Sequence, residues 1–144
     1  MKVTVEQINS NLRFGDWLKN NTVYVPPVLS CAMAALVWAG GSRNDSFDAM
    51  RHAYWNACIT NTVSAEVSAA ATSSYEFTNP NVHNEHVMDL ENNAIGRNIG
   101  GNFPYLIGMT IVQEEIKATA RNGALTVMDD ASNEKGSGVL VPSN

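Results

Sequence analysis

The stretch Asp-Ser-Phe-Asp-Ala-Met-Arg-His-Ala-Tyr-Trp-Asn, residues 45–56, determines the predicted fold and the predicted site. It contains no glycine or proline, and either Asn44 or Ser46 can cap the start of a helix. We therefore predict a helix that runs from Phe47 through at least Asn61. Further from this stretch the sequence is less crowded with polar and aromatic side chains, so the search for chemistry begins here.

One face of this helix carries its polar side chains. At about 100° per residue, they fall within roughly 80° of one another, and they are Asp45, Asp48, His52 and Asn56. Arg51 and Trp55 lie on the flank, and the opposite side is marked by Met50, Ala53, Tyr54 and Ala57. A large aromatic ring beside a polar stripe favours a cleft over a face that meets water.

A second stretch repeats this pattern. A helix predicted from Val82 to about Ile99 places four polar side chains within another span of roughly 80°, namely His86, Asp89, Asn93 and Arg97. Glu85 and Asn92 lie to one side of them. Because the two stripes have matching chemistry, we predict that they face each other and that His52 meets Asp89.

These side chains suit hydrolytic chemistry. A carboxylate orients an imidazole as a general base, two carboxylates and an imidazole can hold a divalent metal, and an arginine neutralises an anion. The candidate catalytic residues are His52, Asp89, Asp48, Arg51 and Arg97, and the candidate substrate-binding residues are Trp55, Tyr54, Asn56, Asn93 and Asn92. The candidate metal ligands are Asp48, Glu85 and His86, for calcium, magnesium or zinc. Tyr75-Glu76, just ahead of a turn, could lend a carboxylate to the site, although a solvated loop is the favoured placement.

The rest of the chain predicts one mainly helical domain over residues 1–144, with about five helices and a short C-terminal β-hairpin or extended tail. Further helices are expected over residues 5–19, 28–39 and 104–122, while residues 64–74 continue the central helix or form another. Residues 20–27 should form an extended loop, because of the proline pair. Residues 28–39 are apolar nearly all round, which predicts a buried central helix. Strands are expected at 125–128 and 139–141.

Composition limits the partners and the compartment. The net charge of -5, with only nine lysines and arginines among 144 residues, argues against non-specific nucleic-acid binding. Cys31 and Cys58 lie among apolar residues, which favours two reduced core thiols over a disulfide. No signal peptide is visible, and the apolar run 27–40 is too short for a transmembrane segment. We expect synthesis in the cytoplasm, and export by a dedicated secretion system would leave no mark.

Two blocks carry a resemblance to a known family. Phe-Asp-Ala-Met-Arg-His-Ala-Tyr-Trp-Asn (47–56) and Met-Asp-Leu-Glu-Asn-Asn-Ala-Ile-Gly-Arg (88–97) resemble a little-characterised bacterial domain family. That family occurs at the C-termini of Rhs-like and other polymorphic toxins or secreted effectors, and also free-standing. The resemblance implies an antibacterial toxin with a cognate immunity protein. Where that family has a His-Glu pair before the second block, this chain has Tyr75-Glu76.

The pattern Phe-Asp-Ala-x-Arg-His-x-x-x-Asn also resembles the active-site helix of small bacterial phospholipases A2. That resemblance implies that His52 activates water, that Asp89 from an antiparallel helix orients it, and that calcium holds the oxyanion. The chain departs from the pattern in two places. The calcium-ligating aspartate after the histidine is replaced by Ala53, and no glycine-rich calcium loop precedes the helix.

The leading hypothesis is a small toxin- or effector-type hydrolase, possessing a His-Asp general base and assisted by a metal. Its substrate would be an ester or phosphoester of an envelope component, such as a phospholipid or a lipid-linked precursor. The first alternative is a non-enzymatic acidic binding module, an immunity or adaptor protein, in which His52 and Asp89 lie apart and exposed. The second alternative is a metal-dependent nuclease, which the negative charge disfavours.

Overall fold

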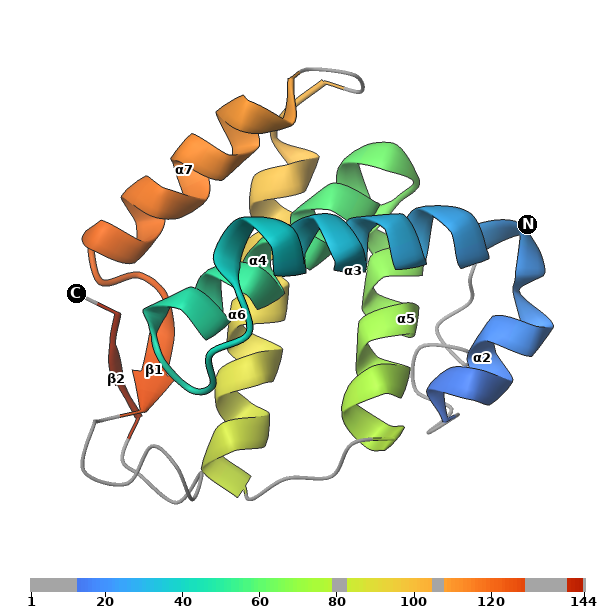
Figure 1. Ribbon diagram of the computed structural model, residues 1–144, viewed down its shortest axis with the longest axis horizontal. Coiled ribbons are helices and arrows are strands. Elements are labelled where there is room, and N and C mark those ends of the chain that lie inside the picture. The colour runs from blue at the N-terminus through green and yellow to red at the C-terminus, as the bar shows by residue number, and fades with distance from the viewer. Residues whose placement is uncertain (1–12, 79–82, 105–107, 129–139, 144) are drawn as a thin grey trace.

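The computed structural model describes residues 13–78, 83–104, 108–128 and 140–143. These residues form six helices and a pair of short antiparallel strands (Figure 1), which confirms the predicted mainly helical fold with a C-terminal hairpin. The elements in chain order are α2 (Phe14–Asn20), the 3-10 turn η1 (Thr22–Tyr24), α3 (Val25–Ala39), α4 (Ser46–Thr62), α5 (Ala65–Thr78), α6 (His83–Gly101), α7 (Met109–Arg121), β1 (Thr126–Met128) and β2 (Leu140–Pro142).

The central element is α4, which packs against α3, α5, α6 and α7. Its predicted extent is confirmed, but the predicted cap is wrong. The N-cap is Asp45, whose side chain accepts a hydrogen bond from the backbone N–H of Asp48 at 2.9 Å. Asn44 instead adopts a left-handed conformation with φ of 64°, which asparagine tolerates better than most residues. Its backbone N–H donates to the Asp48 carboxylate at 2.6 Å, so the turn before α4 already positions that side chain.

Helix α3 corrects two predictions. It begins at Val25 rather than after the proline pair, because prolines in the first turn of a helix sacrifice no hydrogen bond. It is also not a central helix. Only Val28, Cys31, Ala35 and Ala39 are buried, at the spacing of a single helical stripe. The other face is exposed and apolar, with Met33 61% and Val37 78% exposed.

The same segment is longer than the sequence indicated. Together, η1 and α3 form one apolar helical stretch of 18 residues, Thr22–Ala39. Its mean hydropathy is 1.6, and 22% of the stretch is buried. By length and composition alone, this stretch could cross a membrane, which corrects the expectation of a run too short to do so. The core helix of a soluble protein and a signal sequence near the N-terminus have the same two properties.

Helices α4 and α6 touch through their backbones. Gly96 and Gly100 of α6 lie against Ala53 and Ala57 of α4, each pair one turn apart. A Cβ at position 96 would lie 2.7 Å from the Ala53 Cα, and one at position 100 would lie 2.7 Å from the Ala57 Cα. Only glycine therefore permits this approach, which brings the polar stripes of the two helices together.

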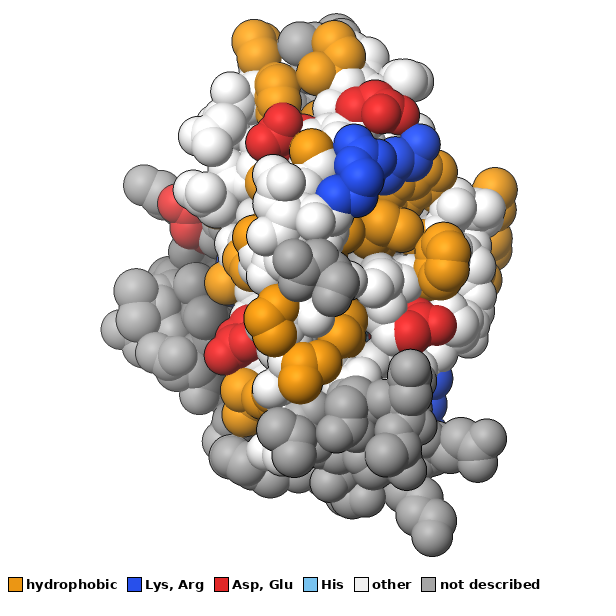
Figure 2. Space-filling model, turned by 90° about the vertical axis from the view of Figure 1, so that its left-hand side faces the viewer, with side chains coloured by type: hydrophobic (Ala, Val, Ile, Leu, Met, Phe, Trp, Pro, Cys, Tyr) orange, Lys and Arg blue, Asp and Glu red, His pale blue; other side chains and the backbone are white. Residues whose placement is uncertain are grey.

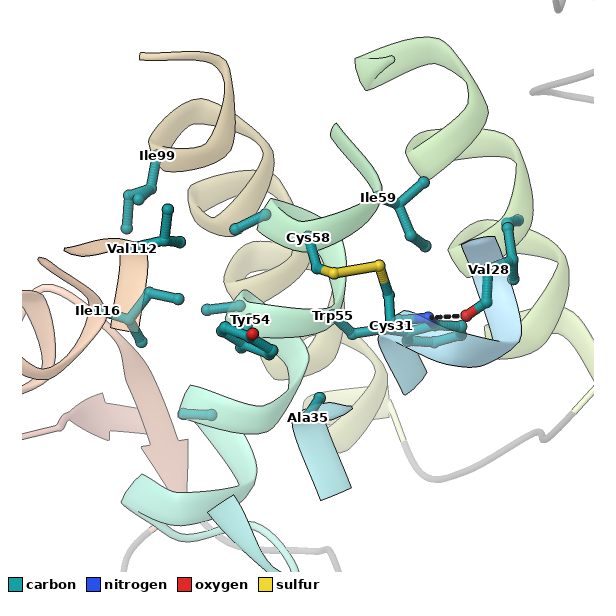
Figure 3. Packing of buried hydrophobic residues seen from close by; sticks show 14 of the residues in the cluster. Val28, Cys31, Ala35, Tyr54, Trp55, Cys58, Ile59, Ile99, Val112 and Ile116 are labelled. Atoms are coloured by element: carbon teal, nitrogen blue, oxygen red, sulfur yellow. Dashed lines mark hydrogen bonds between the residues drawn. A yellow bond between two sulfur atoms is a disulfide. The ribbon is translucent and has the colours of Figure 1, made fainter. Parts of the chain in front are cut away.

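A disulfide joins α3 to α4, which corrects the prediction of two reduced thiols. Cys31 and Cys58 are bonded, with their Cα atoms 5.6 Å apart (Figure 3). Each cysteine looked like an ordinary core residue because each is buried. Their pairing depends on the packing of the two helices, which no local pattern reveals. Beside the disulfide, Trp55 Nε1 donates to the backbone oxygen of Val28 at 3.0 Å, a second tie between the helices.

The C-terminal elements cover one side of the molecule. In β1 and β2, Val127 pairs with Val141, and α7 buries Val112 and Ile116. Pro104 was predicted in the first turn of this helix. That prediction is wrong, because α7 begins at Met109 after Gly108. Figure 2 shows this side, where hydrophobic side chains are interspersed with a group of basic side chains and several scattered acidic ones.

Candidate active site

The two predicted polar stripes do face each other, and the predicted meeting of His52 with Asp89 is confirmed. Each stripe is a series of side chains four residues apart. The series are Asp48, His52 and Asn56 on α4, and Asp89, Asn93 and Arg97 on α6. The contacts advance toward the C-terminus of both helices together. His52 meets Asp89 and Asn93. Asn56, one turn later on α4, meets Asn93 and Arg97. Helices α4 and α6 therefore run in the same direction at the site, unlike the antiparallel pair that the phospholipase resemblance implies.

His52 lies at the centre of a buried group of acids. Its Nε2 is 3.4 Å from Asp48 Oδ1 and 3.4 Å from Asp89 Oδ1. On the other edge of the ring, Nδ1 is 3.2 Å from Asn93 Oδ1 and 3.7 Å from Glu76 Oε1. All five side chains are buried. The imidazole thus has carboxylates at Nε2 and an amide oxygen at Nδ1.

Glu76 belongs to the site, although the sequence analysis favoured the other placement. It was expected in a solvated loop, but α5 continues to Thr78 and holds Glu76 only 2% exposed. Burial, the neighbouring charge of Asp89 and the hydrogen bond with Asp89 together raise its pKa to about 8, against the opposing charge of His52. Glu76 therefore holds a proton at neutral pH. The signal available in the sequence was the absence of glycine and proline before Asn79.

The acids also perturb the imidazole. Burial opposes a positive charge on His52, but the hydrogen bond to Asp48 and the charges of Asp89, Asp48 and Glu76 outweigh it and raise its pKa to about 9. Burial likewise raises the pKa of Asp89. For Asp48 the opposite holds. Burial would raise its pKa, yet the hydrogen bond and charge of His52, the charge of Arg51 and the hydrogen bond from the Asn44 backbone together lower it.

Arg51 bridges the site and the loop before α4. Its guanidinium pairs with the Asp48 carboxylate and donates to the backbone oxygens of Gly40 and Ser42 at 3.0 and 2.9 Å. Arg97 lies deeper and donates to Asn56 Oδ1 at 3.0 Å. Its burial lowers the pKa of the guanidinium, which nevertheless stays charged. The two arginines thus belong to the site, at opposite ends of the paired series.

A cavity of about 220 Å³ opens beside His52. His52 and Arg51 contribute to its lining from α4, and the remaining lining residues are mainly apolar, namely Phe14, Leu29, Ala32, Ala35, Leu36, Trp55 and Tyr75. The rings of Phe14, Trp55 and Tyr75 meet edge to face, with centroids 5.4 to 6.3 Å apart. The cleft expected from Trp55 is therefore present, and its described lining is apolar apart from His52, Arg51 and Tyr75.

Four of the predicted site residues lie away from this centre. Glu85 is held by Arg43 through two hydrogen bonds of 2.7 and 2.9 Å. Asn92 pairs with the backbone of Thr126 in β1, at 2.7 and 2.9 Å. Tyr54 packs against Trp38 in the core, with ring centroids 5.1 Å apart. His86 is half-buried one turn before Asp89 and takes no part in the group around His52.

Asp48, His52 and Asp89 could together hold a metal ion, since one ligand atom from each lies within 4.8 Å of the others. The 3.4 Å separations from Nε2 to the two carboxylates are long for charge-assisted hydrogen bonds, which are about 2.7–2.9 Å. They match the edge of a tetrahedron around a zinc-like ion with bonds of about 2.1 Å, which is about 3.4 Å. The donor set and its spacing therefore fit a divalent cation. Of the predicted metal ligands, only Asp48 belongs to this group.

Comparison with known proteins adds one match. A family model described as "Domain of unknown function (DUF6973)" matches residues 17–124, which include α3 to α7 and both polar series. No curated protein and no solved structure matches the chain.

Proposed function

Because the chain belongs to the DUF6973 domain family, we propose its activity from its site: a small hydrolase that cleaves an ester or phosphoester of an amphiphilic envelope component. The substrate class is a phospholipid or a lipid-linked precursor. The observation that carries the proposal is the apolar cavity with His52 and Arg51 in its lining. Apolar walls accept a hydrocarbon chain, whereas a buried imidazole with two aspartates offers hydrolytic chemistry at one end.

The surface around the cavity supports an amphiphilic substrate. Leu29 and Leu36 line the cavity and are also exposed, so the exposed face of α3 continues into the cavity wall. No residue of α3 is charged. A lipid chain could therefore pass from an apolar surface toward His52 without crossing a charged rim. At the inner end, Arg51 is placed to steady an anionic phosphate or carboxylate.

We propose that a divalent cation assists the reaction. With a pKa of about 9, His52 holds a proton at neutral pH and cannot accept another. It must lose that proton before it can act as a general base. Asp48, His52 and Asp89 would hold such a cation with Nε2 of His52 unprotonated, and its charge would balance the two aspartates. Such an ion supplies a Lewis acid and a water of lowered pKa. One imidazole with two carboxylates suits zinc better than calcium, which takes six to eight oxygens, or magnesium, which keeps several waters.

The toxin or effector role is proposed on two grounds. The first is the resemblance of the blocks 47–56 and 88–97 to domains of polymorphic toxins. The second is the bond between Cys31 and Cys58, because disulfides persist in oxidising compartments such as the periplasm. The protein would then be made in the cytoplasm, exported by a dedicated system and act on the envelope. A producing cell would need a cognate immunity protein.

The two alternatives fit the geometry less well. An acidic binding module that uses the polar stripes as an interface needs His52 and Asp89 apart and exposed, yet both are buried and their side chains lie 3.4 Å apart. A nuclease needs a path for a charged phosphate backbone toward the metal. The cavity beside His52 is instead walled by aromatic and aliphatic side chains, and among its described lining residues Arg51 is the only lysine or arginine.

The decisive experiment compares purified wild-type protein, supplied with Zn²⁺, with the variants His52→Ala and Asp89→Asn on vesicles of phosphatidylglycerol and phosphatidylethanolamine. Release of fatty acid or headgroup is measured by mass spectrometry, and circular dichroism checks the fold. Asn98→Ala, an exposed site on α6, serves as the matched control. We expect both site variants to lose at least a hundredfold in rate. Full activity in folded variants would contradict the assignment, and cleavage of added DNA or RNA instead of lipid would favour the nuclease.

A further inference from the structure

Two buried asparagines next to His52 do not reach the cavity, although the sequence analysis assigned both to substrate binding. Resting on the metal-assisted form of the proposed function, we propose that Asn93 and Asn56 are positioning residues. They hold the imidazole of His52 so that Nε2, and not Nδ1, is the nitrogen offered to a divalent cation. The argument follows the hydrogen bonds from α5 inward to the ring.

Three hydrogen-bond donors fix the orientation of the Asn56 amide, the outer of the two asparagines. Its Oδ1 accepts hydrogen bonds from Ser68 Oγ at 2.8 Å, Thr72 Oγ1 at 3.0 Å and Arg97 Nη1 at 3.0 Å. A guanidinium can only donate, so the atom that faces it must be the amide oxygen. The amide nitrogen of Asn56 then points the other way, where it donates to the His52 backbone oxygen at 3.0 Å and to Asn93 Oδ1 at 2.8 Å.

The orientation of the Asn93 amide, nearer to His52, follows from that of Asn56. Because the Asn56 amide nitrogen is a donor, the atom of Asn93 that it contacts must be the oxygen. The same oxygen lies 3.2 Å from His52 Nδ1, and an amide oxygen can only accept. Nδ1 must therefore carry a hydrogen. The other ring nitrogen, Nε2, is left facing the carboxylates, each 3.4 Å away.

This arrangement is what a metal-binding histidine requires. A ligating imidazole donates its second N–H to a fixed acceptor, which sets the ring orientation, and losing that acceptor commonly weakens metal binding about 10- to 100-fold. Here the acceptor is Asn93, and Ser68 and Thr72 of α5 connect to it through Asn56. The side chains of Ser68 and Thr72 thus act on the site although neither contacts the imidazole.

The experiment measures metal binding in the full chain without substrate. Zn²⁺ affinity is determined by competition with a chromophoric chelator for wild type, Asn93→Leu, Asn93→Asp and the control Asn98→Leu. We expect Asn93→Leu to bind Zn²⁺ 10- to 100-fold more weakly, Asn98→Leu to match wild type, and Asn93→Asp to recover affinity because it keeps an acceptor. In the Zn²⁺ complex of ¹⁵N-labelled wild type, the imidazole shifts should identify Nε2 as the ligating nitrogen and Nδ1 as protonated.

Each contrary outcome overturns a stated part. Equal affinity of folded Asn93→Leu and wild type would remove the positioning role, as would ligation through Nδ1. If Asn93→Leu does not fold, Asn93→Asp and the ¹⁵N shifts still decide. A wild-type chain that does not bind Zn²⁺ at micromolar concentration would refute the metal site itself. None of these readouts uses hydrolysis, so the failure of this inference is distinct from a failure to find the substrate.

Discussion

Replacing Gly96 with alanine should push apart the two helices that form the site. The added Cβ would lie 2.7 Å from the Ala53 Cα, whereas non-bonded carbon atoms prefer about 3.5–4 Å. The helices must therefore separate by about 1 Å. Forced overpacking of this kind costs about 1–3 kcal/mol, which for a chain of this size lowers Tm by about 3–10 °C. The same displacement would stretch the 3.2 Å contact between His52 and Asn93 beyond hydrogen-bond length.

The matched control is Gly101→Ala on the same helix. A Cβ there would meet only the Thr60 Cγ2 at 3.9 Å, an ordinary contact. Since alanine favours a helix over glycine by up to about 1 kcal/mol, this variant should be neutral or slightly more stable. Thermal and urea unfolding of both variants would measure the contrast. If Gly96→Ala were as stable as Gly101→Ala, the close backbone contact between α4 and α6 would be refuted.

Three further predictions concern charge, the disulfide and the apolar face. In protein stripped of metal, the pKa of Glu76 is about 8 in the folded chain, against an ordinary value of 4.5. The free energy of unfolding should therefore fall as the pH rises from 4.5 to about 8. Glu76→Gln should flatten that fall and gain up to about 3 kcal/mol at pH 7 in urea unfolding, and an unchanged pH profile would count against it. Reduction of Cys31–Cys58, which closes a loop of sequence separation 27, should cost about 3 kcal/mol in the wild type and nothing in the double serine variant. Met33→Glu, on the exposed face of α3, should slow cleavage of vesicle lipid several-fold without slowing cleavage of a soluble short-chain ester; equal slowing of both would contradict a role for that face.

Much of the site could be predicted because it follows a helical period. Asp48 and His52 are four residues apart on one helix, and Asp89 and Asn93 are four apart on another, so each series was visible from spacing alone. That the two series meet was inferred from the matching chemistry of the two stripes. For Glu76 a solvated loop was favoured over the site because its helix was expected to end before it.

Other features could not be predicted because they depend on how helices pack. The pairing of Cys31 with Cys58 requires α3 to lie across α4, and no local pattern encodes that crossing. The same crossing leaves one side of α3 exposed, although its sequence is apolar all round. Glu85 looked like a metal ligand beside Asp89, but Arg43, distant in sequence, binds it.

The shared direction of α4 and α6 has a consequence for the chain between them. Two neighbouring helices that point the same way need a connection that runs back between them, and α5, which packs beside both, is that connection (Figure 1). Along α5 the contacts run backwards, from Ser68 at Asn56 to Glu76 at His52. Helix α5 therefore does more than connect α4 to α6. It also carries the third acid of the site and its outermost hydrogen-bond donors.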